Sequence, residues 1–345
     1  MERLVKIMYC GTLQWGTTSL ARMEALQELR HSVYGFDKRR FIREWGFGKN
    51  LVDWAQQRLC IGPNIWNLQK QLVLEAEVYK PDLLWIDQGS EINRDTIQKI
   101  KRRTNTTCVH YTPDSIKAPG MLTRLLYNAI PSYDTCITTK AHEVDQYNSI
   151  GARAVLYSQK GFSPRIHRPT KILASEYKTY NVDIVFIGQY QSERAEYLAS
   201  LAESLPYALK IWGRGWGRGK TGKVLSRLSA GWAHGDVYAK ALSGAKVGLG
   251  FLNVKVGDKY TSRTFEIPAC RCFMLAQRTY EQQEFFIEGK EAEYFSTIPE
   301  MLEKLDYYLK NLKKRKIIAS NGYKRALHSG YTWKDRMRCI LEDIF

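Results

Sequence analysis

The sequence lacks the features of a membrane-spanning, disulfide-bonded or metal-binding protein. It contains no apolar run of about 18 residues, the length that a transmembrane helix needs. Its amino terminus has no long apolar stretch ahead of a cleavage site, so we expect no targeting segment. The seven cysteines are scattered, and the one close pair, Cys270 and Cys272, has no neighbouring residues that would complete a metal site. These absences predict a reduced, cytoplasmic protein that holds no metal.

A glycine turn near the amino terminus lacks the lysine of a phosphate-binding P-loop. Gly11 and Gly16 have P-loop spacing, but Thr17 and Thr18 follow directly where that motif requires Lys, so we exclude a P-loop nucleotide triphosphatase. An apolar run precedes the turn and a helical pattern follows it, with Thr17 or Thr18 as the N-cap. The turn would then lie at the carboxyl end of a strand, where open α/β sheets bind ligands. Tight packing of the two glycines explains the motif equally well.

Acidic side chains are in deficit. Basic residues outnumber them by 52 to 35, which gives a net charge of +17 and favours polyanionic partners such as nucleic acid, anionic membrane, acidic glycan or a phosphorylated substrate. Each basic cluster taken alone is also consistent with a solvated helix face. The clusters are residues 38–43, 99–103, 213–220 and 313–316. The candidate contacts with nucleic acid or membrane are Arg39, Arg40, Arg102 and Arg103.

Aromatic residues are interleaved with the basic runs, and they could stack on bases or be buried in a core. They are Phe41, Trp45, Phe47, Trp212 and Trp216.

Strand-like runs alternate with helical patterns along the chain, which predicts an α/β protein. Prolines and polar residues interrupt the alternation once, so we expect two Rossmann-like domains that face an interdomain cleft. The predicted strands are residues 4–10, 32–37, 82–87, 107–112, 134–139 and 154–158, then 182–188, 208–213, 246–252, 272–277 and 291–296. The predicted divisions are a first domain (1–165), a linker (166–181), a second domain (182–330) and a carboxyl-terminal helix (331–345).

Residues 257–275 carry the most informative pattern. The candidate caps of a short helix are Thr261, Ser262 and Thr264. Arg263 and Glu266 lie three residues apart on one of its faces. Hydroxyls, free N–H groups and an arginine at a helix start can bind an anion. A carboxylate further along can accept hydrogen bonds from ribose hydroxyls. The segment therefore predicts a nucleoside diphosphate site, although Arg263 and Glu266 could instead pair with each other.

Three segments resemble the carboxyl-terminal domain of the CgeB-like, spore-maturation glycosyltransferases: "TSRTFEIPACRCFML", "FFIEGKEAEYFSTIPEMLEKLDYYL" and "IASNGYKRALHSGYTWKDRM". That family is related to the large retaining GT-B group that includes sucrose synthases and mannosyltransferases. The resemblance covers most of residues 182–340 and extends more loosely over the first half. It implies the GT-B fold, a UDP- or GDP-linked sugar as donor substrate, no bound cofactor, retention of configuration and no metal. The sequence contains no Asp-x-Asp pair, which suits a transferase that uses no metal.

The resemblance also implies roles for individual residues. Wider relatives carry two glutamates separated by seven residues; Glu266 takes the second position, implied to bind ribose, and Asp258 takes the first. Gln189 stands where an arginine is usual, so the implied diphosphate partners are Arg194 and Arg263, and Arg263 would also stabilise the leaving group. Where the family usually has glycine, this chain has Arg271. The candidate donor-binding residues are Gly188, Arg194, Gly213, His234, Asp258, Ser262, Arg263, Thr264 and Glu266.

The first domain is predicted to bind the acceptor. His110 is expected just past a strand end, facing the presumed cleft, as a catalytic residue or as a structural histidine. Asp87, Gln88 and Ser90 fall at another strand end. The candidate acceptor-side residues are Gly11, Gly16, Thr17, Asp87 and Asp114.

The acceptor itself is left open by these patterns. A basic enzyme could dock at the inner face of an anionic membrane and modify a surface glycan or lipid-linked acceptor, which the resemblance favours. The same charge would suit glycosylation of modified bases in DNA, including phage DNA. A non-catalytic nucleic-acid-binding protein on a transferase scaffold is the third possibility, which the presence of Arg263 and Glu266 disfavours.

Overall fold

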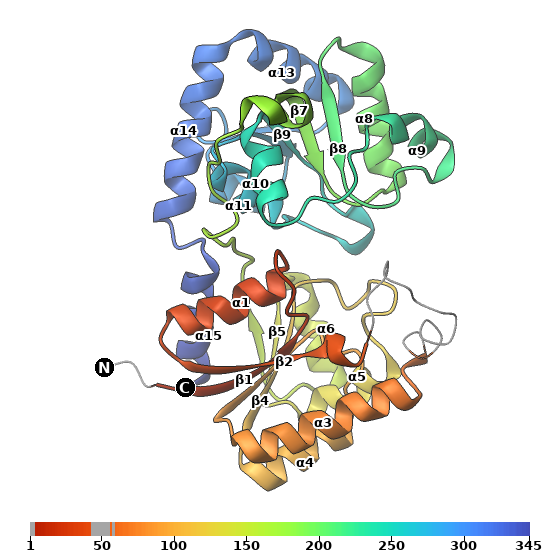
Figure 1. Cartoon of the computed structure of the whole chain (residues 1–345), viewed down its shortest axis with the longest axis vertical. Helices are drawn as coiled ribbons and strands as arrows, with labels where there is room; N and C mark the ends of the chain where they lie inside the picture. The colour runs from red at the N-terminus through yellow and green to blue at the C-terminus, as the bar shows by residue number, and fades with distance from the viewer. Residues whose placement is uncertain (1–3, 43–55, 57–58) are drawn as a thin grey trace. The chain divides into compact units, whose positions relative to one another are not determined.

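The computed structural model describes residues 4–42, 56 and 59–345, and its chain forms two compact units (Figure 1). The first unit is Met1–Lys160 together with Trp333–Phe345, and the second is Gly161–Thr332. Residues 166–181, predicted as a linker, therefore belong to the second unit, where they include the short helix α7 (Tyr177–Tyr180). The carboxyl-terminal helix α15 (Trp333–Ile344) belongs to the first unit. Among the described helices, none combines the length and apolar character needed to cross a bilayer.

The first domain is a parallel sheet between two helical layers, as the alternating pattern predicts. Its strand order is β2-β1-β3-β4-β5-β6. Side chains of successive strand residues point to opposite faces, so Ile7, Tyr9 and Trp85 pack with α1 and α15, whereas Met8 and Ile86 pack with α3, α4, α5 and α6. The strands are β1 (Lys6–Gly11), β2 (Ser32–Asp37), β3 (Leu83–Asp87), β4 (Thr107–Thr112), β5 (Thr135–Thr138) and β6 (Val155–Tyr157). The helices are α1 (Thr18–Glu28), α3 (Pro63–Tyr79), α4 (Arg94–Thr104), α5 (Arg124–Ala129) and α6 (Val144–Ile150).

The glycine turn after β1 is used for packing and capping. The Thr17 hydroxyl accepts a hydrogen bond from the Leu20 N–H at 3.2 Å, which confirms Thr17 as the N-cap of α1. A Cβ atom on Gly11 would lie 2.3 Å from Ser19 Oγ, so only glycine lets α1 approach the strand end this closely. Gly16 adopts a φ of 84°, which glycine tolerates without steric cost. These contacts support the packing explanation for the motif.

The second domain repeats the α/β plan on a parallel sheet of order β11-β10-β9-β7-β8. Helices α8 and α13 pack on one face, and α10 and α11 pack on the other. The strands predicted for the first and for the second domain are confirmed. The strands are β7 (Val182–Ile187), β8 (Leu209–Trp212), β9 (Ala245–Gly250), β10 (Phe273–Gln277) and β11 (Glu293–Phe295). The helices, besides α7, are α8 (Ser192–Ser204), α9 (Gly219–Leu225), α10 (Asp236–Ser243), α11 (Arg263–Ala269), α12 (Tyr280–Phe285), α13 (Ile298–Lys310) and α14 (Leu312–His328).

A buried ion pair joins three elements of the first domain. Arg22 on α1 donates to Asp87 Oδ2 at 2.7 Å, and the two side chains are only 1% and 3% exposed. Tyr9 on β1 donates to the same oxygen at 2.9 Å. The Arg22 guanidinium also lies over the rings of Tyr111 and Trp333, at 4.6 and 5.0 Å from the ring centroids. Because Trp333 opens α15, this arginine connects the chain's last helix to the first domain.

We predict that Arg22→Ala lowers the free energy of unfolding by about 3–5 kcal/mol, because it leaves the Asp87 carboxylate buried without its counter-charge. Chemical denaturation measures the loss. Arg39→Ala is the matched control, since Arg39 pairs with Asp37 at 2.7 Å on the surface and such pairs contribute about 0–1 kcal/mol. Equal effects of the two substitutions would contradict this account of the buried pair.

Candidate functional site

The carboxyl ends of β7 and β8 lie in unusually close backbone contact. Gly213 follows β8 with a φ of 140°, and a Cβ atom at this position would lie 1.9 Å from the carbonyl oxygen of Gly188. The Gly188 N–H donates to the Trp212 carbonyl at 2.8 Å, and its carbonyl accepts from Trp216 Nε1 at 3.0 Å. The two predicted glycines are thus brought together, and they bring the loops after both strands to one point of the sheet edge.

Two arginines meet at the same edge. Arg263, at the start of α11, donates from Nε to the Ile187 carbonyl at 3.1 Å, the last residue of β7. Arg194, in the first turn of α8, donates from Nη1 to the Gln189 carbonyl at 3.3 Å. Burial, followed by the charge of Arg263, lowers the pKa of Arg194 to about 10, so both guanidinium groups are cationic at neutral pH. Two guanidinium groups at one point of the sheet edge make it suited to a phosphate group.

Glu266 is buried among polar groups that the sequence did not reveal. Its Oε2 accepts a hydrogen bond from the Tyr238 hydroxyl, and its Oε1 lies 3.6 Å from His167 Nε2. His167 Nδ1 accepts from the Ser163 N–H at 3.1 Å, which leaves the ring proton on Nε2, facing the carboxylate. Burial lowers the pKa of His167 although Glu266 acts in the opposite direction. A carboxylate has about four lone-pair positions, so Glu266 keeps acceptor capacity beyond these contacts.

Sequence reasoning missed His167 and Tyr238. His167 stands in the stretch interpreted as a linker, and Tyr238 stands in a helix named only for its amino-terminal loop. The one feature of the sequence that could have indicated this contact with Glu266 is a histidine among the polar residues before β7.

The hydroxyl groups at the start of α11 are engaged within the domain. Of the three predicted cap candidates, Ser262 stands at the N-cap position with a helical φ of −58°, but its side chain makes no capping hydrogen bond. The Thr264 hydroxyl donates to Gln282 Oε1 at 2.7 Å. Thr261 supplies the capping contact instead, because its hydroxyl accepts from the Arg263 N–H at 3.2 Å. Arg263, more than these hydroxyls, offers charge to a ligand.

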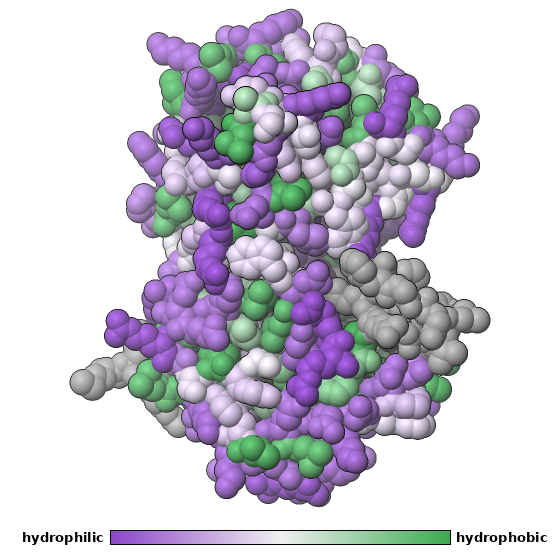
Figure 2. Space-filling view, viewed as in Figure 1, coloured by the Kyte–Doolittle hydropathy of each residue, from purple (hydrophilic) through white to green (hydrophobic). Residues whose placement is uncertain are grey.

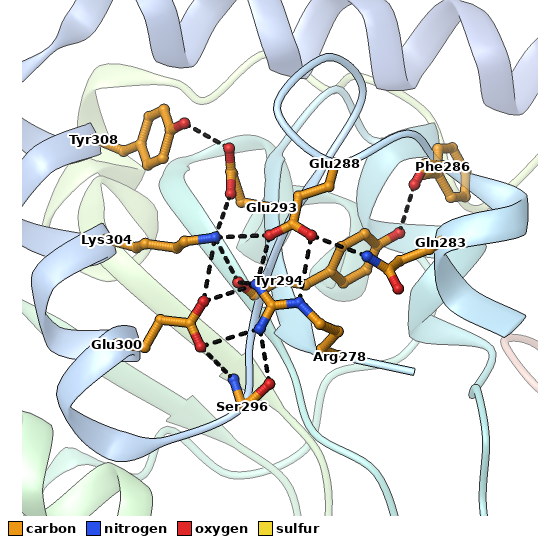
Figure 3. A network of polar contacts seen from close by, with 10 residues as sticks. All are labelled: Arg278, Gln283, Phe286, Glu288, Glu293, Tyr294, Ser296, Glu300, Lys304 and Tyr308. Atoms are coloured by element: carbon orange, nitrogen blue, oxygen red, sulfur yellow. Dashed lines mark hydrogen bonds and ion pairs between the residues drawn. The ribbon is translucent and has the colours of Figure 1, made fainter. Parts of the chain in front are cut away.

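Asp258 lines a cavity of about 390 Å³ beyond the ends of β9, β10 and β11. One wall is Arg278, which donates to Glu288 at 2.6 Å and to Glu300 at 2.7 Å (Figure 3). Lys304 joins the same network through Glu288 at 2.8 Å. Because its neighbours neutralise Arg278, this network holds the wall in place more than it attracts an anion. The other polar lining residues are Lys259, Gln277, Thr279 and Ser296.

His234 lies in the loop before α10, as predicted, and is exposed. Its ring centroid is 4.6 Å from that of Trp232, and the Arg214 guanidinium lies 3.0 Å from the centroid of the Trp232 ring. This loop and the segment after β8, which carries Arg214, therefore bring three side chains together within the second domain. This group is a candidate surface for the planar base of a nucleotide.

The prediction that His110 lies just past a strand end is wrong. β4 continues through Thr112, because His110 is paired with Ile86 on β3 and with Cys136 on β5. The ring is fully buried, its Nε2 lies 3.2 Å from the Tyr147 hydroxyl, and burial lowers the pKa of His110 to about 3. The imidazole is therefore neutral and inside the first domain.

Among the acceptor-side candidates, Asp87 is occupied by Arg22, whereas Asp114 is exposed at the end of β4. Gln88, which follows β3, donates from Nε2 to Asp114 Oδ2 at 3.2 Å. Gln88 adopts a φ of 69°, which is uncommon outside glycine and typical of functional sites. The partly buried Gln88 amide and the exposed Asp114 carboxylate form a polar pair at the carboxyl edge of this sheet.

The four arginines proposed as polyanion contacts are mostly paired. Arg39 contacts Asp37 at 2.7 Å, Arg40 contacts Glu75 at 2.8 Å, and Arg103 contacts Glu77. Arg102 lies in the last turn of α4, where a cation complements the helix dipole. Neighbouring elements thus supply carboxylates that the clusters lack in sequence.

The surface of both domains is predominantly hydrophilic on the side drawn in Figure 2. Trp212 and Trp216 are buried, Phe41 is partly buried, and Trp45 and Phe47 lie outside the described residues.

Within the described ranges, no group of three or more His, Cys, Asp or Glu side chains is arranged to hold a metal ion.

Comparisons with known proteins agree with this architecture. Residues 194–342 match a protein-family model described as "Glycosyl transferase-like". No curated protein sequence matches the chain. Sucrose-phosphate synthase from Thermosynechococcus elongatus matches with a TM-score of 0.68 and 11% identity over 98% of both chains. Anabaena HepE, solved with UDP and glucose, matches with a TM-score of 0.65 and 12% identity over 99% of both chains.

A glycosyltransferase from Rickettsia africae ESF-5 matches with a TM-score of 0.61 and 11% identity over 98% of this chain and 96% of that chain. The TM-scores, over nearly the full length of each chain, show that the fold is shared. The protein has the two parallel-sheet, Rossmann-like domains of the GT-B glycosyltransferases, as the resemblance implied.

We predict that Gly213→Ala lowers the free energy of unfolding more than Gly217→Ala does. Gly217 has a similar φ of 152° but open space around it, so its substitution carries backbone strain of about 1–3 kcal/mol. Gly213→Ala adds a clash with the Gly188 carbonyl, which we expect to cost about 1–3 kcal/mol more. Thermal unfolding of the two variants measures the difference, and equal losses would contradict the close contact between the loops.

Proposed function

We propose that the protein is a nucleotide-sugar-dependent glycosyltransferase whose second domain binds the donor. The observation that carries this proposal is the pair of cations, Arg194 and Arg263, at the carboxyl end of β7. The residues matched by the "Glycosyl transferase-like" model include both arginines. A structure of HepE is described as a complex with UDP-glucose, which supports a UDP-linked donor here over a GDP-linked one.

In this proposal the bond between the sugar's anomeric carbon and the diphosphate oxygen breaks, and the acceptor hydroxyl oxygen forms the new bond and gives up its proton. The diphosphate gains negative charge as it leaves, so Arg194 and Arg263 stabilise the transition state more than the bound donor. Glu266 accepts hydrogen bonds from the ribose, with Tyr238 and His167 holding its carboxylate in place. Asp258 faces the sugar side of the site from the adjoining cavity.

The same proposal assigns the acceptor to the first domain. Gln88 and Asp114 are polar groups there that could bind a hydroxyl, and we propose them in place of the buried His110. A surface glycan or a lipid-linked sugar fits the resemblance to CgeB-like enzymes. Retention of configuration, independence of metal and membership of that subfamily are parts of the proposal that the resemblance supports.

A panel of nucleotide sugars tests the donor assignment. A ligand present at about 100 times its Kd adds about 2.7 kcal/mol of stability, so the correct donor raises Tm clearly. We expect UDP-sugars to stabilise the protein, with the shift persisting in EDTA. Stabilisation by no member of the panel would overturn the proposal, and stabilisation only with added Mg²⁺ or Mn²⁺ would overturn metal independence.

We predict that Arg263→Ala weakens binding of UDP by about 1.5–3 kcal/mol, the range for a hydrogen bond to a charged group, while binding of uridine changes little. Isothermal titration calorimetry measures both ligands. Arg218→Ala removes an exposed arginine that precedes α9 and serves as the control. An equal loss for UDP and uridine would mean that Arg263 shapes the domain and does not bind the diphosphate.

A further inference from the structure

Helix α14 (Leu312–His328) has an exposed face that is cationic along its length. Its sequence, LKKRKIIASNGYKRALH, contains no acidic residue. Lys313, Lys316 and Lys324 are exposed and make no ion pair within the part of the chain that the structure describes. Their spacing places them on one side of the helix, opposite the buried Ile318 and Gly322.

Aliphatic side chains lie between these lysines. Ile317 is 51% exposed and Leu327 is 38% exposed, and the 3.6-residue period places both on the lysine-bearing face. The opposite face packs so closely that a Cβ atom on Gly322 would lie 2.3 Å from the Glu291 carbonyl oxygen. The helix is therefore held by its small and apolar residues, and it turns a mixed cationic and aliphatic face outward (α14, blue, Figure 1).

Arg271 adds a fourth cation from another element. It lies two residues after Ala269, the last residue of α11, and adopts a φ of 56° at a helix end where glycine is the favoured residue. Its exposed guanidinium Nη2 lies 3.5 Å from Ser320 Oγ, midway along the exposed face of α14. A large side chain is thus kept in a backbone conformation that disfavours it, and its charge joins the lysines.

The position of the lysines is also unfavourable for the helix itself. Lys313, Lys314 and Lys316 occupy the first turns, where the helix dipole favours acidic residues, and the first turn has none. Local stability therefore accounts neither for these cations nor for Arg271. A departure from local preference at several neighbouring positions is typical of a functional surface.

We propose that the outward face of α14, with Arg271, docks on an anionic phospholipid bilayer. Headgroup phosphates complement the four cations, and the exposed Ile317 and Leu327 enter the interfacial region, as in amphipathic helices that lie on membranes. Nucleic acid would complement the charge but would leave the two aliphatic side chains without a function. None of the residues of this surface is a candidate donor-binding residue, so this proposal does not depend on the transferase assignment.

Vesicle sedimentation tests the proposal with the full-length protein. We expect binding to phosphatidylglycerol–phosphatidylcholine vesicles and little binding to pure phosphatidylcholine. Each cation near an anionic membrane strengthens binding about fivefold, so K313Q/K316Q/K324Q should lower the partition coefficient on the order of a hundredfold. The control K220Q/K223Q/R227Q removes the same charge from α9 and the turn after it, and should retain most of the binding. If both triple variants lose vesicle binding equally, net charge alone explains the binding, and the proposal is overturned.

Two further variants separate docking from folding and from nucleic-acid binding. Arg271→Gly should lower vesicle binding about fivefold while keeping or raising Tm, because glycine suits the left-handed conformation. I317S/L327S leaves the charge unchanged and should weaken vesicle binding but not binding to duplex DNA. Unchanged vesicle binding in these variants, or loss of DNA binding alone in the triple lysine variant, would overturn the proposal. The UDP-sugar stabilisation should be the same in every variant, so failure here is distinguishable from failure of the transferase assignment.

Discussion

Parallel strand pairing is the constraint on which the rest of this structure depends. Every pair in both sheets is parallel, so the carboxyl ends of all strands in a domain lie along one edge. In the second domain this edge collects Gly188, Gly213 and Arg263 from segments far apart in the sequence. In the first domain it collects Gln88 and Asp114. The loops that follow the strands can then vary in chemistry without altering the packed core.

The environment decides what each charge does. Arg22 and Asp87 form a buried pair that joins α1, β3 and α15, so their charges stabilise the fold. Arg194 and Arg263 donate to backbone carbonyls at the carboxyl end of β7, and these contacts orient the two guanidinium groups. The lysines of α14 face solvent. Net charge alone does not distinguish these groups, whereas burial, backbone contacts and exposure to solvent do.

Local pattern was a good guide wherever the determining interaction is itself local. The alternation of strands and helices follows from hydrophobic periodicity, and the Thr17 cap follows from a hydroxyl three residues before the N–H that it accepts from. His110 shows the limit. Its strand was predicted through Thr112, but its burial depends on pairing with two neighbouring strands, which no local pattern contains. Asp87 fails as an acceptor candidate for the same reason, because its partner is on a distant helix.

Hydrophobic periodicity predicts the two-domain α/β architecture and the position of its strands, and the family resemblance points to Arg194, Arg263 and Glu266 as candidate donor residues. Tertiary structure alone decided that His167 and Tyr238 hold Glu266, that α15 returns to the first domain, and that Arg271 joins the face of α14. The physical reason is that periodicity and capping act over a few residues. Burial, ion pairing and carboxylate environment depend on groups that only the folded chain brings within a few ångströms.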